Sequence, residues 1–331
     1  MTEGDAMRAA WYEKNGAAAE VLMVGEMETP RPGPGEVRVK LATSGVNPSD
    51  VKSRAGTARK IAFPRVIPHS DGAGEIDMAG EGVPATRVGE RVWTWNAQWK
   101  RPFGTAAEYV VLPSAQAVAL PAHIDFAAGA CLGIPALTAW HALALADARA
   151  GSKLLIAGGA GAVAHYAIQF ARARGASVIT TVSSGEKAQV ARAAGADHTI
   201  DYKRENVGER VAALTEKAGV DAVIELDLAA NAGLIPAVLR PKGTVVVYGT
   251  GKPEVAIPAG FCLVNSIRLQ FMLVYELTAQ ERARAIDDIT ALLKANALVH
   301  NVAARMPLAG IVAAHRLVED GKAIGNVVME L

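Results

Sequence analysis

The chain has 331 residues, of which 51% are hydrophobic and 20% are charged, a composition typical of a globular protein with more than one domain. The net charge is +1 and there is no basic block or acidic tail, which argues against a nucleic-acid-binding protein. Cys131 and Cys262 are too few for a disulfide framework or a four-cysteine zinc site.

Two segments bear on where the protein resides. Glu3 and Asp5 precede any apolar run, so we expect no signal peptide. Residues 127–146 contain no Asp, Glu, Lys or Arg, but Pro135, His141 and the scattered Gly and Ala favour a pair of buried helices over a membrane span. We therefore expect a soluble cytoplasmic protein with no membrane partner.

The first third of the chain is rich in Gly and Pro and contains short runs in which apolar and polar residues alternate. Such runs occupy residues 36–41, 74–76, 90–95 and 107–112. Strict alternation bounded by turn residues predicts an antiparallel β domain, open or barrel-like.

From about Phe126 the pattern changes to alternating strands and helices. The expected strands are residues 153–158, 177–182, 198–200, 222–226 and 244–248. The expected helices are residues 162–174, 185–194, 207–218 and 229–239. Continuous apolar strands that alternate with helices predict a doubly wound parallel sheet.

Beyond Phe271 the pattern loosens. We expect a helix over residues 278–295, a strand over 302–306, a helix near 309–319 and a final strand over 326–331. The apolar segment 267–274 follows the last of the parallel strands. It either pairs with a second subunit at a sheet edge or lies inside the sheet.

The turn after the strand at 153–158 is the most informative motif. It consists of Gly158, Gly159, Ala160, Gly161, Ala162 and Val163, and residues 159–164 fit the G-x-G-x-x-A form of the dinucleotide fingerprint. The alternative is a tight strand–helix turn without a ligand. The surrounding pattern favours the dinucleotide, because a strand precedes the turn, a helix follows it, and a second strand ends about 20 residues later, where the ribose-selecting residue belongs.

The end of that second strand indicates which dinucleotide is bound. It runs into Ser183 and Ser184 instead of an acidic residue, and Lys187 follows. Two hydroxyl groups and an ammonium group suit a 2′-phosphate, whereas a free 2′-hydroxyl is usually bound by a carboxylate. Lys187 is alternatively a solvated residue on the first turn of a helix. This ending favours NADPH over NADH.

Further candidate cofactor residues follow the later strands. Tyr202 comes after the third strand and is placed to cover the adenine ribose, although an ordinary half-buried aromatic residue is the alternative. Asp227 and Asn231 follow the fourth strand, and Gly249 and Thr250 follow the fifth. These loops open at the carboxyl edge of the sheet, where the nicotinamide half is expected.

Four motifs taken together resemble a known family. They are GVNPSD at 45–50, IPHSDGAG at 67–74, VGERV at 88–92 and GTAAEYV at 104–110. With the order of a β domain, a dinucleotide domain and a C-terminal return, the chain resembles the medium-chain dehydrogenase/reductase superfamily, and within it the zinc-independent quinone oxidoreductases of the zeta-crystallin-like branch. The resemblance spans nearly the whole chain. It implies a GroES-like catalytic domain formed by both chain ends, with the dinucleotide domain inserted between them.

The positions that bind zinc in other members of that superfamily differ here. Zinc-dependent relatives have a cysteine at the place of Asn47, and their Gly-His-Glu matches His69-Ser70-Asp71, so that their ligand histidine falls on Ser70. No cysteine-rich lobe follows Gly89. Only Asp71 is left as a ligand at the matching positions, so we expect no catalytic zinc.

Two other positions depart from the quinone oxidoreductases. Their tyrosine five places after the asparagine is Lys52 here, and the paired glycines of their phosphate turn are reduced to Gly161-Ala162. Alanine fits a turn with ordinary backbone angles, so we expect the turn to be kept.

Without a metal, reduction of a quinone or an activated C=C bond is easier than oxidation of an alcohol, because a few donors can hold the charge that develops on a carbonyl oxygen. Asn47 offers an amide donor, which could instead contact the cofactor ribose or carboxamide. Lys52 is a proton donor if burial lowers its pKa, and otherwise a surface lysine on a short helix over 49–54. Asp50 is favoured as a helix N-terminal residue over a catalytic acid.

A cluster of aromatic residues precedes the turn at Phe103-Gly104. Trp93, Trp95 and Trp99 fall within seven positions of one another. We expect them to form an apolar lid or wall for a flat substrate, and the alternative is a hydrophobic plug beneath the β domain.

The sequence therefore predicts an α/β protein with a Rossmann doubly wound parallel sheet and a β-rich GroES-like catalytic domain. The expected segments are 1–125 for the first part of the catalytic domain, 126–273 for the dinucleotide domain and 274–331 for the return. We expect an NADPH-dependent reductase of quinones or α,β-unsaturated carbonyls that acts on a small molecule as a homodimer. The alternatives are a zinc-dependent alcohol dehydrogenase and an NADPH-binding protein without turnover.

Overall fold

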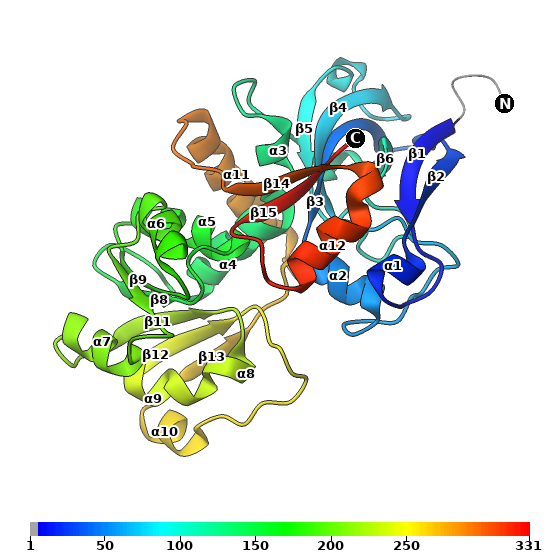
Figure 1. Ribbon diagram of the computed structural model, residues 1–331. Coiled ribbons are helices and arrows are strands. Elements are labelled where there is room, and N and C mark those ends of the chain that lie inside the picture. The colour runs from blue at the N-terminus through cyan, green and yellow to red at the C-terminus, as the bar shows by residue number, and fades with distance from the viewer. Residues whose placement is uncertain (1–5) are drawn as a thin grey trace. The chain divides into compact units, whose positions relative to one another are not determined.

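The computed structural model describes residues 6–331, and its chain divides into two compact units (Figure 1). Unit 1 contains the described residues up to Ile134 together with Ile286–Leu331, and unit 2 contains Pro135–Ala285. Both boundaries lie further along the chain than residues 125 and 273. Glu3 and Asp5, on which the expectation about a signal peptide rests, lie outside the described residues.

Unit 2 is built on a sheet of six parallel strands in the order β10-β9-β8-β11-β12-β13. The strands are β8 (Lys153–Ile156), β9 (Ser177–Val182), β10 (His198–Asp201), β11 (Val220–Glu225), β12 (Leu239–Val247) and β13 (Arg268–Phe271). The strand order reverses between β8 and β11, which makes their carboxyl ends the place where a doubly wound sheet binds its ligand. The expected doubly wound sheet is confirmed, and β13 is an edge strand.

The helices of unit 2 follow the expected alternation with one exception. They are α4 (Leu137–Leu145), α5 (Ala162–Ala173), α6 (Gly185–Ala193), α7 (Val207–Leu214), α8 (Leu228–Asn231), α9 (Ile235–Val238), α10 (Ala259–Val264) and the first part of α11 (Ala279–Lys294). The single helix expected over 229–239 is wrong, because α8 and α9 are separated by a 3₁₀ turn, Ala232–Leu234. Gly233 lies in that turn, and Pro236 is the second residue of α9, in the first turn, where its missing N–H is tolerated.

Unit 1 contains a seven-stranded sheet in the order β14-β15-β3-β4-β5-β7, with β6 also paired to β3, and a separate β1–β2 pair. Its strands are β1 (Ala6–Trp11), β2 (Met23–Glu28), β3 (Glu36–Val46), β4 (Asp71–Ala79), β5 (Arg91–Thr94), β6 (Tyr109–Pro113), β7 (Ala117–Ala119), β14 (Val302–Pro307) and β15 (Asn326–Glu330). The C-terminal strand β15, red in Figure 1, pairs antiparallel with β3, so that Val327 lies opposite Val46. Both chain ends therefore build this unit.

The helices of unit 1 are α1 (Ala18–Val21), α2 (Pro48–Ala55), α3 (Phe126–Gly129), the last part of α11, and α12 (Ile311–Glu319). Arg54 of α2 is fully buried and donates hydrogen bonds to the Gly16 carbonyl at 2.5 Å and to the Glu319 carboxylate at 3.0 Å. These bonds tie α2 to α12 and to the loop before α1. The start of α2 follows directly on β3, and the bonds of Arg54 hold the last turn of the helix.

Within residues 6–331, no helix has both the length and the apolar character that crossing a membrane requires. The uncharged stretch at 127–146 forms most of α3, a π-helical turn (Leu132–Ala136) and α4, and nearly all of it is buried.

Candidate functional site

The glycine turn of unit 2 connects β8 to α5 at the carboxyl edge of the sheet. Gly158 has a φ of +69°, which a residue with a side chain rarely adopts. A Cβ at Gly159 would lie 2.3 Å from the Thr180 hydroxyl oxygen, so only glycine fits there. Gly161 is the N-cap of α5 and its side-chain-free backbone leaves the first N–H groups of the helix uncapped. This arrangement fits a pyrophosphate at a helix N-terminus.

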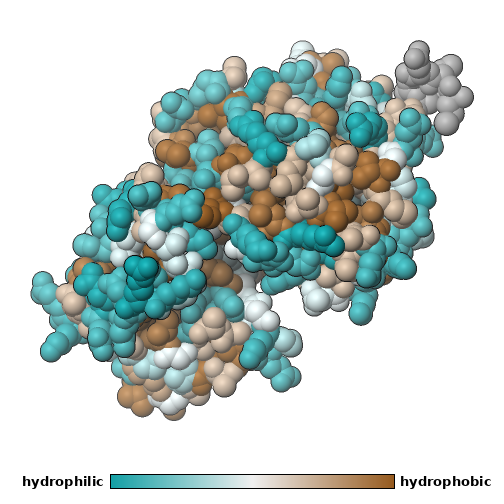
Figure 2. Space-filling view, viewed as in Figure 1, coloured by the Kyte–Doolittle hydropathy of each residue, from teal (hydrophilic) through white to brown (hydrophobic). Residues whose placement is uncertain are grey.

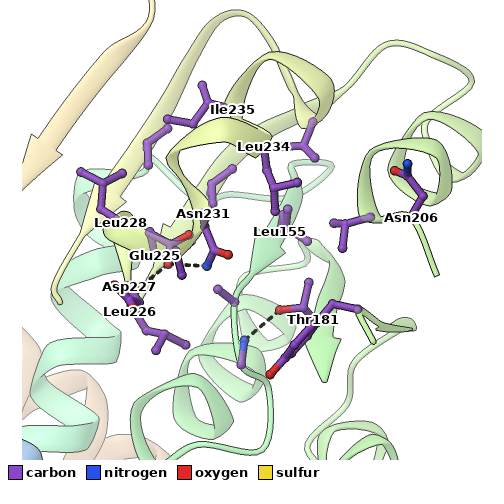
Figure 3. A pocket seen from close by; sticks show the side chains of 18 of the residues that line it. Leu155, Thr181, Asn206, Glu225, Leu226, Asp227, Leu228, Asn231, Leu234 and Ile235 are labelled. Atoms are coloured by element: carbon purple, nitrogen blue, oxygen red, sulfur yellow. Dashed lines mark hydrogen bonds between the residues drawn. The ribbon is translucent and has the colours of Figure 1, made fainter. Parts of the chain in front are cut away.

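A cavity of about 530 Å³ lies at this edge of the sheet (Figure 3). Among its lining residues are four that the sequence analysis named, Gly158, Tyr202, Asp227 and Asn231. They follow β8, β10 and β11, and the cavity continues beneath α8 and α9 to apolar side chains of the sheet such as Leu155. A volume of this size accommodates a small molecule or half of a dinucleotide.

Several polar side chains of the cavity were not singled out as binding residues from the sequence, among them Thr181 and Glu225. Thr181 accepts a hydrogen bond from the Gly158 N–H at 3.1 Å, which holds the glycine turn against β9 (Figure 3). Glu225 accepts hydrogen bonds from the Asp227 N–H at 2.6 Å and from Asn231 Nδ2 at 2.9 Å. Burial raises the pKa of Glu225 above its usual value in spite of these bonds. No sequence signal marks Glu225, because it reads as the end of a strand.

The loops after β11 and β12 are joined to each other. The Asp227 carboxylate accepts a hydrogen bond from the Gly251 N–H at 2.7 Å, and the Gly249 carbonyl accepts one from the Leu228 N–H at 3.2 Å. A Cβ at Gly249 would lie 2.2 Å from the Leu226 carbonyl oxygen. Asp227 therefore lines the cavity and Gly249 belongs to the loop that is bonded to it, whereas Thr250 bonds to the Lys252 carbonyl within its own loop.

The proposed 2′-phosphate residues lie at the start of α6. Ser184 is the N-cap of that helix, and its hydroxyl accepts the Lys187 N–H at 3.3 Å. Ser183, Ser184 and Lys187 are all partly exposed, and none of them lines the 530 Å³ cavity. The structure thus brings these three residues together on one helix turn, next to β9 and apart from Asp227.

In unit 1, Asn47 lies between two buried carboxyl groups. Its Nδ2 donates to Asp71 Oδ2 at 2.8 Å, and its backbone N–H donates to Asp50 Oδ2 at 2.8 Å. Burial raises the pKa of Asp50 to about 7 and that of Asp71 well above its usual range. Asp50 occupies the helix N-terminal position that the sequence predicts, but its burial was not foreseen. The two carboxyl groups hold Asn47 in one orientation at the start of α2.

The donor set at this place does not fit a zinc ion. Asn47 and Ser70 stand at the positions of two ligands, and Asp71 Oδ2 is already engaged by Asn47 and by the Ile134 N–H at 3.1 Å. Zinc needs three thiolate, imidazole or carboxylate ligands. Across residues 6–331, no three His, Cys, Asp or Glu side chains are grouped closely enough to hold a metal ion.

Lys52 does not meet the condition set for it as a proton donor. That role requires burial, and the residue is exposed on α2. Of the two alternatives for Lys52, the structure supports the surface lysine and not the buried proton donor.

A series of buried hydrogen bonds runs through unit 1 from His315 to the backbone of Asp71. His315 Nε2 lies 2.9 Å from His69 Nε2, His69 Nδ1 lies 2.8 Å from the Ser44 hydroxyl, and Ser44 lies 2.8 Å from the Thr105 hydroxyl. Thr105 in turn donates to the Asp71 carbonyl at 2.5 Å. All four of these side chains are buried. These hydrogen bonds could not be predicted from the sequence, because the four residues come from four distant segments.

The direction of every hydrogen bond in this series follows from its last member. A carbonyl oxygen only accepts, so the hydroxyl proton of Thr105 is donated to the Asp71 carbonyl. Thr105 must then accept from the Ser44 hydroxyl, and Ser44 must accept from His69 Nδ1–H. Burial lowers the pKa of both histidines, to about 3 for His315, so both are neutral. His69 Nε2 is then an acceptor and His315 donates to it.

The tryptophan residues do not act together. Trp93 is fully buried on β5, so the expectation that it lines a substrate pocket is corrected to a core position. Trp99 lines a second cavity of about 400 Å³ in unit 1, and Trp95 is partly buried outside it.

Comparison with known proteins defines the class. The model of the alcohol dehydrogenase GroES-like domain matches residues 33–122, and the zinc-binding dehydrogenase model matches residues 162–291. The quinone oxidoreductase of Rattus norvegicus is 34% identical over 245 residues, which are 73% of each chain. The 2-haloacrylate reductase of a Burkholderia species is 29% identical over 320 residues, 92% of this chain and 93% of that protein.

A solved structure agrees with these relatives. A mycobacterial protein in complex with NADPH superposes with a TM-score of 0.88 at 28% identity and covers 98% of this chain and 100% of its own. The fold and these matches define a member of the medium-chain dehydrogenase/reductase superfamily. Within that superfamily the chain belongs to the quinone oxidoreductase branch, and it is an oxidoreductase.

Proposed function

We propose that the protein reduces quinones or α,β-unsaturated carbonyl compounds with NADPH and without a metal ion. The observation that carries this proposal is the site of unit 1, where an amide stands between two carboxyl groups in place of a zinc-binding set. The relatives named above act on a quinone and on a 2-haloacrylate, which is an activated alkene. Both kinds of acceptor take up a hydride and gather negative charge on oxygen.

NADPH binding is proposed for the carboxyl edge of unit 2. The glycine turn from Gly158 to Val163 would take the pyrophosphate, and Tyr202, Asp227, Gly249 and Thr250 would border the nucleoside parts. Ser183, Ser184 and Lys187 would bind the 2′-phosphate, since hydroxyl groups donate hydrogen bonds to it and the ammonium adds charge. When bound, NADPH supplies the hydride.

Asn47 is the residue proposed to hold the oxygen of the acceptor. Its amide carries two N–H donors, of which Asp71 takes one, and Asp71 fixes the plane of the amide. A fixed donor stabilises developing negative charge without reorganisation during the reaction. Asp50 is the residue proposed to supply the proton, because burial raises its pKa to about 7, whereas Lys52 is exposed and does not meet the burial condition set for it.

The test is a panel of quinones and enones, each offered with NADPH and with NADH. We expect NADPH oxidation with at least one acceptor, undiminished after treatment with a chelator. Tight NADPH binding with no acceptor consumed would instead favour the binding protein without turnover. One zinc per chain together with alcohol oxidation would favour the alcohol dehydrogenase.

A homodimer through the edge of unit 2 is part of the proposal. β13 leaves one side of its backbone unpaired at the sheet edge, and Phe271 is 62% exposed. Leu263 and Val264 on α10 are each 82% exposed, and Figure 2 shows apolar side chains on the surface where α10 lies in Figure 1. Exposed edge strands readily pair with a second chain. Light scattering should report a dimer that Phe271→Glu converts to monomer, and a monomeric unchanged protein would contradict it.

The cellular location belongs to the proposal as well. Cys131 and Cys262 are both free thiols. Free thiols are typical of the reducing cytoplasm, where we expect the protein to act.

A further inference from the structure

The 400 Å³ cavity of unit 1 is lined by positively charged and aromatic side chains. Arg59, Lys60 and Lys100 supply the charge. Aromatic and aliphatic side chains make up most of the remaining lining: Tyr12, Ile61, Ala62, Phe63, Val66 and Trp99. Every lining residue belongs to unit 1. A cavity with this lining suits a flat ligand that carries negative charge.

Arg59 is held in place by neutral groups. Its Nη2 donates to Gln98 Oε1 at 2.5 Å, and its guanidinium carbon lies 4.9 Å from the centre of the Trp99 ring. Gln98 is fixed in turn, because its Nε2 donates to the Arg101 carbonyl at 2.9 Å. A guanidinium group has five N–H donors, and an amide and a ring face do not neutralise its charge. Arg59 is therefore oriented but still able to bind an anion.

No acidic side chain forms an ion pair with Arg59 in the described residues, so the charge of its guanidinium group is not neutralised by one. The ion pairs found within residues 6–331 include neither Arg59 nor Lys60. Arg59 does act on Asp50 and lowers the pKa of that carboxyl, but burial outweighs this effect and raises the pKa to about 7. Asp50 is thus only partly ionised at neutral pH.

Tyr12 completes the polar side of the cavity. Burial raises the pKa of its phenol to about 12, so the hydroxyl is neutral and can donate a hydrogen bond. Arg59 and Asp50 both act on this phenol through their charges. Ser53 of α2 also lines the cavity, so the cavity borders the helix that begins at Asn47.

We propose that this cavity is a carboxylate subsite centred on Arg59, and that the protein prefers acceptors in which the flat unsaturated group carries a carboxylate. A fixed guanidinium fork binds a carboxylate through two parallel hydrogen bonds, while Trp99 and Tyr12 border the flat part. The inference rests on the proposed function, because it assigns the class of acceptor to the same site.

The kinetic test compares two acceptors that differ only in charge, a benzoquinone with a propanoate side chain and its methyl ester. With NADPH, the acid should have the lower KM. Arg59→Gln should raise the KM of the acid about tenfold or more and change that of the ester less than about threefold. Arg59→Lys keeps the charge but loses the two-pronged guanidinium group. Its KM for the acid should lie between those of the unchanged protein and Arg59→Gln. Arg65→Gln is the matched control, since Arg65 pairs with Glu13 and does not line the cavity.

A binding test that needs no turnover separates this inference from the proposed function. Benzoate should bind the unchanged protein without NADPH, bind Arg59→Gln about tenfold more weakly, and inhibit competitively against the acid. Benzoate binding that depends on Arg59, with no acceptor reduced, would support the subsite and overturn the proposed function. Equal KM values for acid and ester in both proteins would overturn the subsite alone. Non-competitive inhibition by benzoate would overturn it too, since the anion would then be a separate effector.

Discussion

His315 Nε2 lies 2.9 Å from His69 Nε2, although the two residues are 246 positions apart in the chain. His315 comes from α12 in the C-terminal return, and His69 precedes β4 with a φ of +77°, a backbone conformation that favours glycine. The ring of His69 is fixed on both sides, by His315 and by Ser44, and these bonds hold the strained backbone. The return of the chain therefore supports the segment that carries Asp71.

Replacing His315 by alanine should destabilise unit 1. His315→Ala leaves His69 Nε2 as a buried acceptor without a donor and opens a cavity at a fully buried position. We expect the free energy of unfolding to fall by about 2–4 kcal/mol in urea titrations at neutral pH. His198→Ala, at an exposed position, should change it by less than about 0.5 kcal/mol. If His315→Ala lowered the free energy of unfolding by an equally small amount, the stabilising role of the His315–His69 hydrogen bond would be contradicted.

The raised pKa of Asp50 predicts a pH-dependent stability. Between its ordinary value of 3.8 and about 7, the folded protein keeps a proton that the unfolded chain releases, so this group lowers stability as pH rises through that window. Asp50→Asn removes the effect. The stability of this variant relative to the unchanged protein should therefore rise by about 1 kcal/mol per pH unit from pH 4 to 7 and level off above.

The control for that measurement is an exposed acid of the same type. Asp287→Asn makes the same substitution at an exposed position and is measured over the same pH range. If the difference for Asp50→Asn were constant over that range, Asp50 would titrate in the folded protein as it does in solvent.

The cofactor preference should depend on the start of α6. In the double variant Lys187→Ala with Ser183→Asp, an ammonium is lost and a carboxylate faces the 2′ position, so the preference for NADPH over NADH should fall by about 100-fold or reverse. Equilibrium binding of both nucleotides measures it. Lys153→Ala is the matched control, because Lys153 begins β8 at the opposite edge of the sheet. Equal affinities for the two nucleotides in the unchanged protein would refute the assignment.

The glycine turn should not tolerate a methyl group at Gly159. In Gly159→Ala the new Cβ meets Thr180, so either β9 or the turn must move. We expect a loss of about 1–3 kcal/mol in stability and weaker NADPH binding. At Gly185 a Cβ meets nothing within 4 Å, and Gly185→Ala should leave stability and binding nearly unchanged. Gly159→Ala with unaltered binding would show that the turn does not form the pyrophosphate site.

The sequence allowed the fold of unit 2 to be predicted because its signals are local. Strand β8, the glycine turn and α5 follow one another within about twenty residues, and each has its own apolar or glycine pattern. The helix expected over 229–239 failed for an equally local reason, since Gly233 and Pro236 interrupt it.

The site of unit 1 could be predicted only in part. Asn47 and Asp50 stand out because they begin a helix directly after a strand. Whether Asp50 is buried and Lys52 exposed depends on which parts of the protein pack against α2. The apolar pattern of an eight-residue helix is too short to show which face is packed. Ser44, Thr105 and His315 meet only after β15 has paired with β3, so no spacing along the chain points to them.

The central claim is that this protein transfers a hydride from NADPH to an unsaturated acceptor without a metal ion. The most direct measurement incubates the chelator-treated protein with NADPH deuterated at C4 and a set of enones and quinones, and analyses the products by mass spectrometry and NMR. We predict deuterium on the β-carbon of a reduced enone. With a quinone we predict one hydroquinone formed per NADPH consumed, with the label lost to the solvent because phenolic O–D exchanges with water. An acceptor left unreduced, a reduced enone without deuterium, or activity that the chelator abolishes and zinc restores would contradict the account.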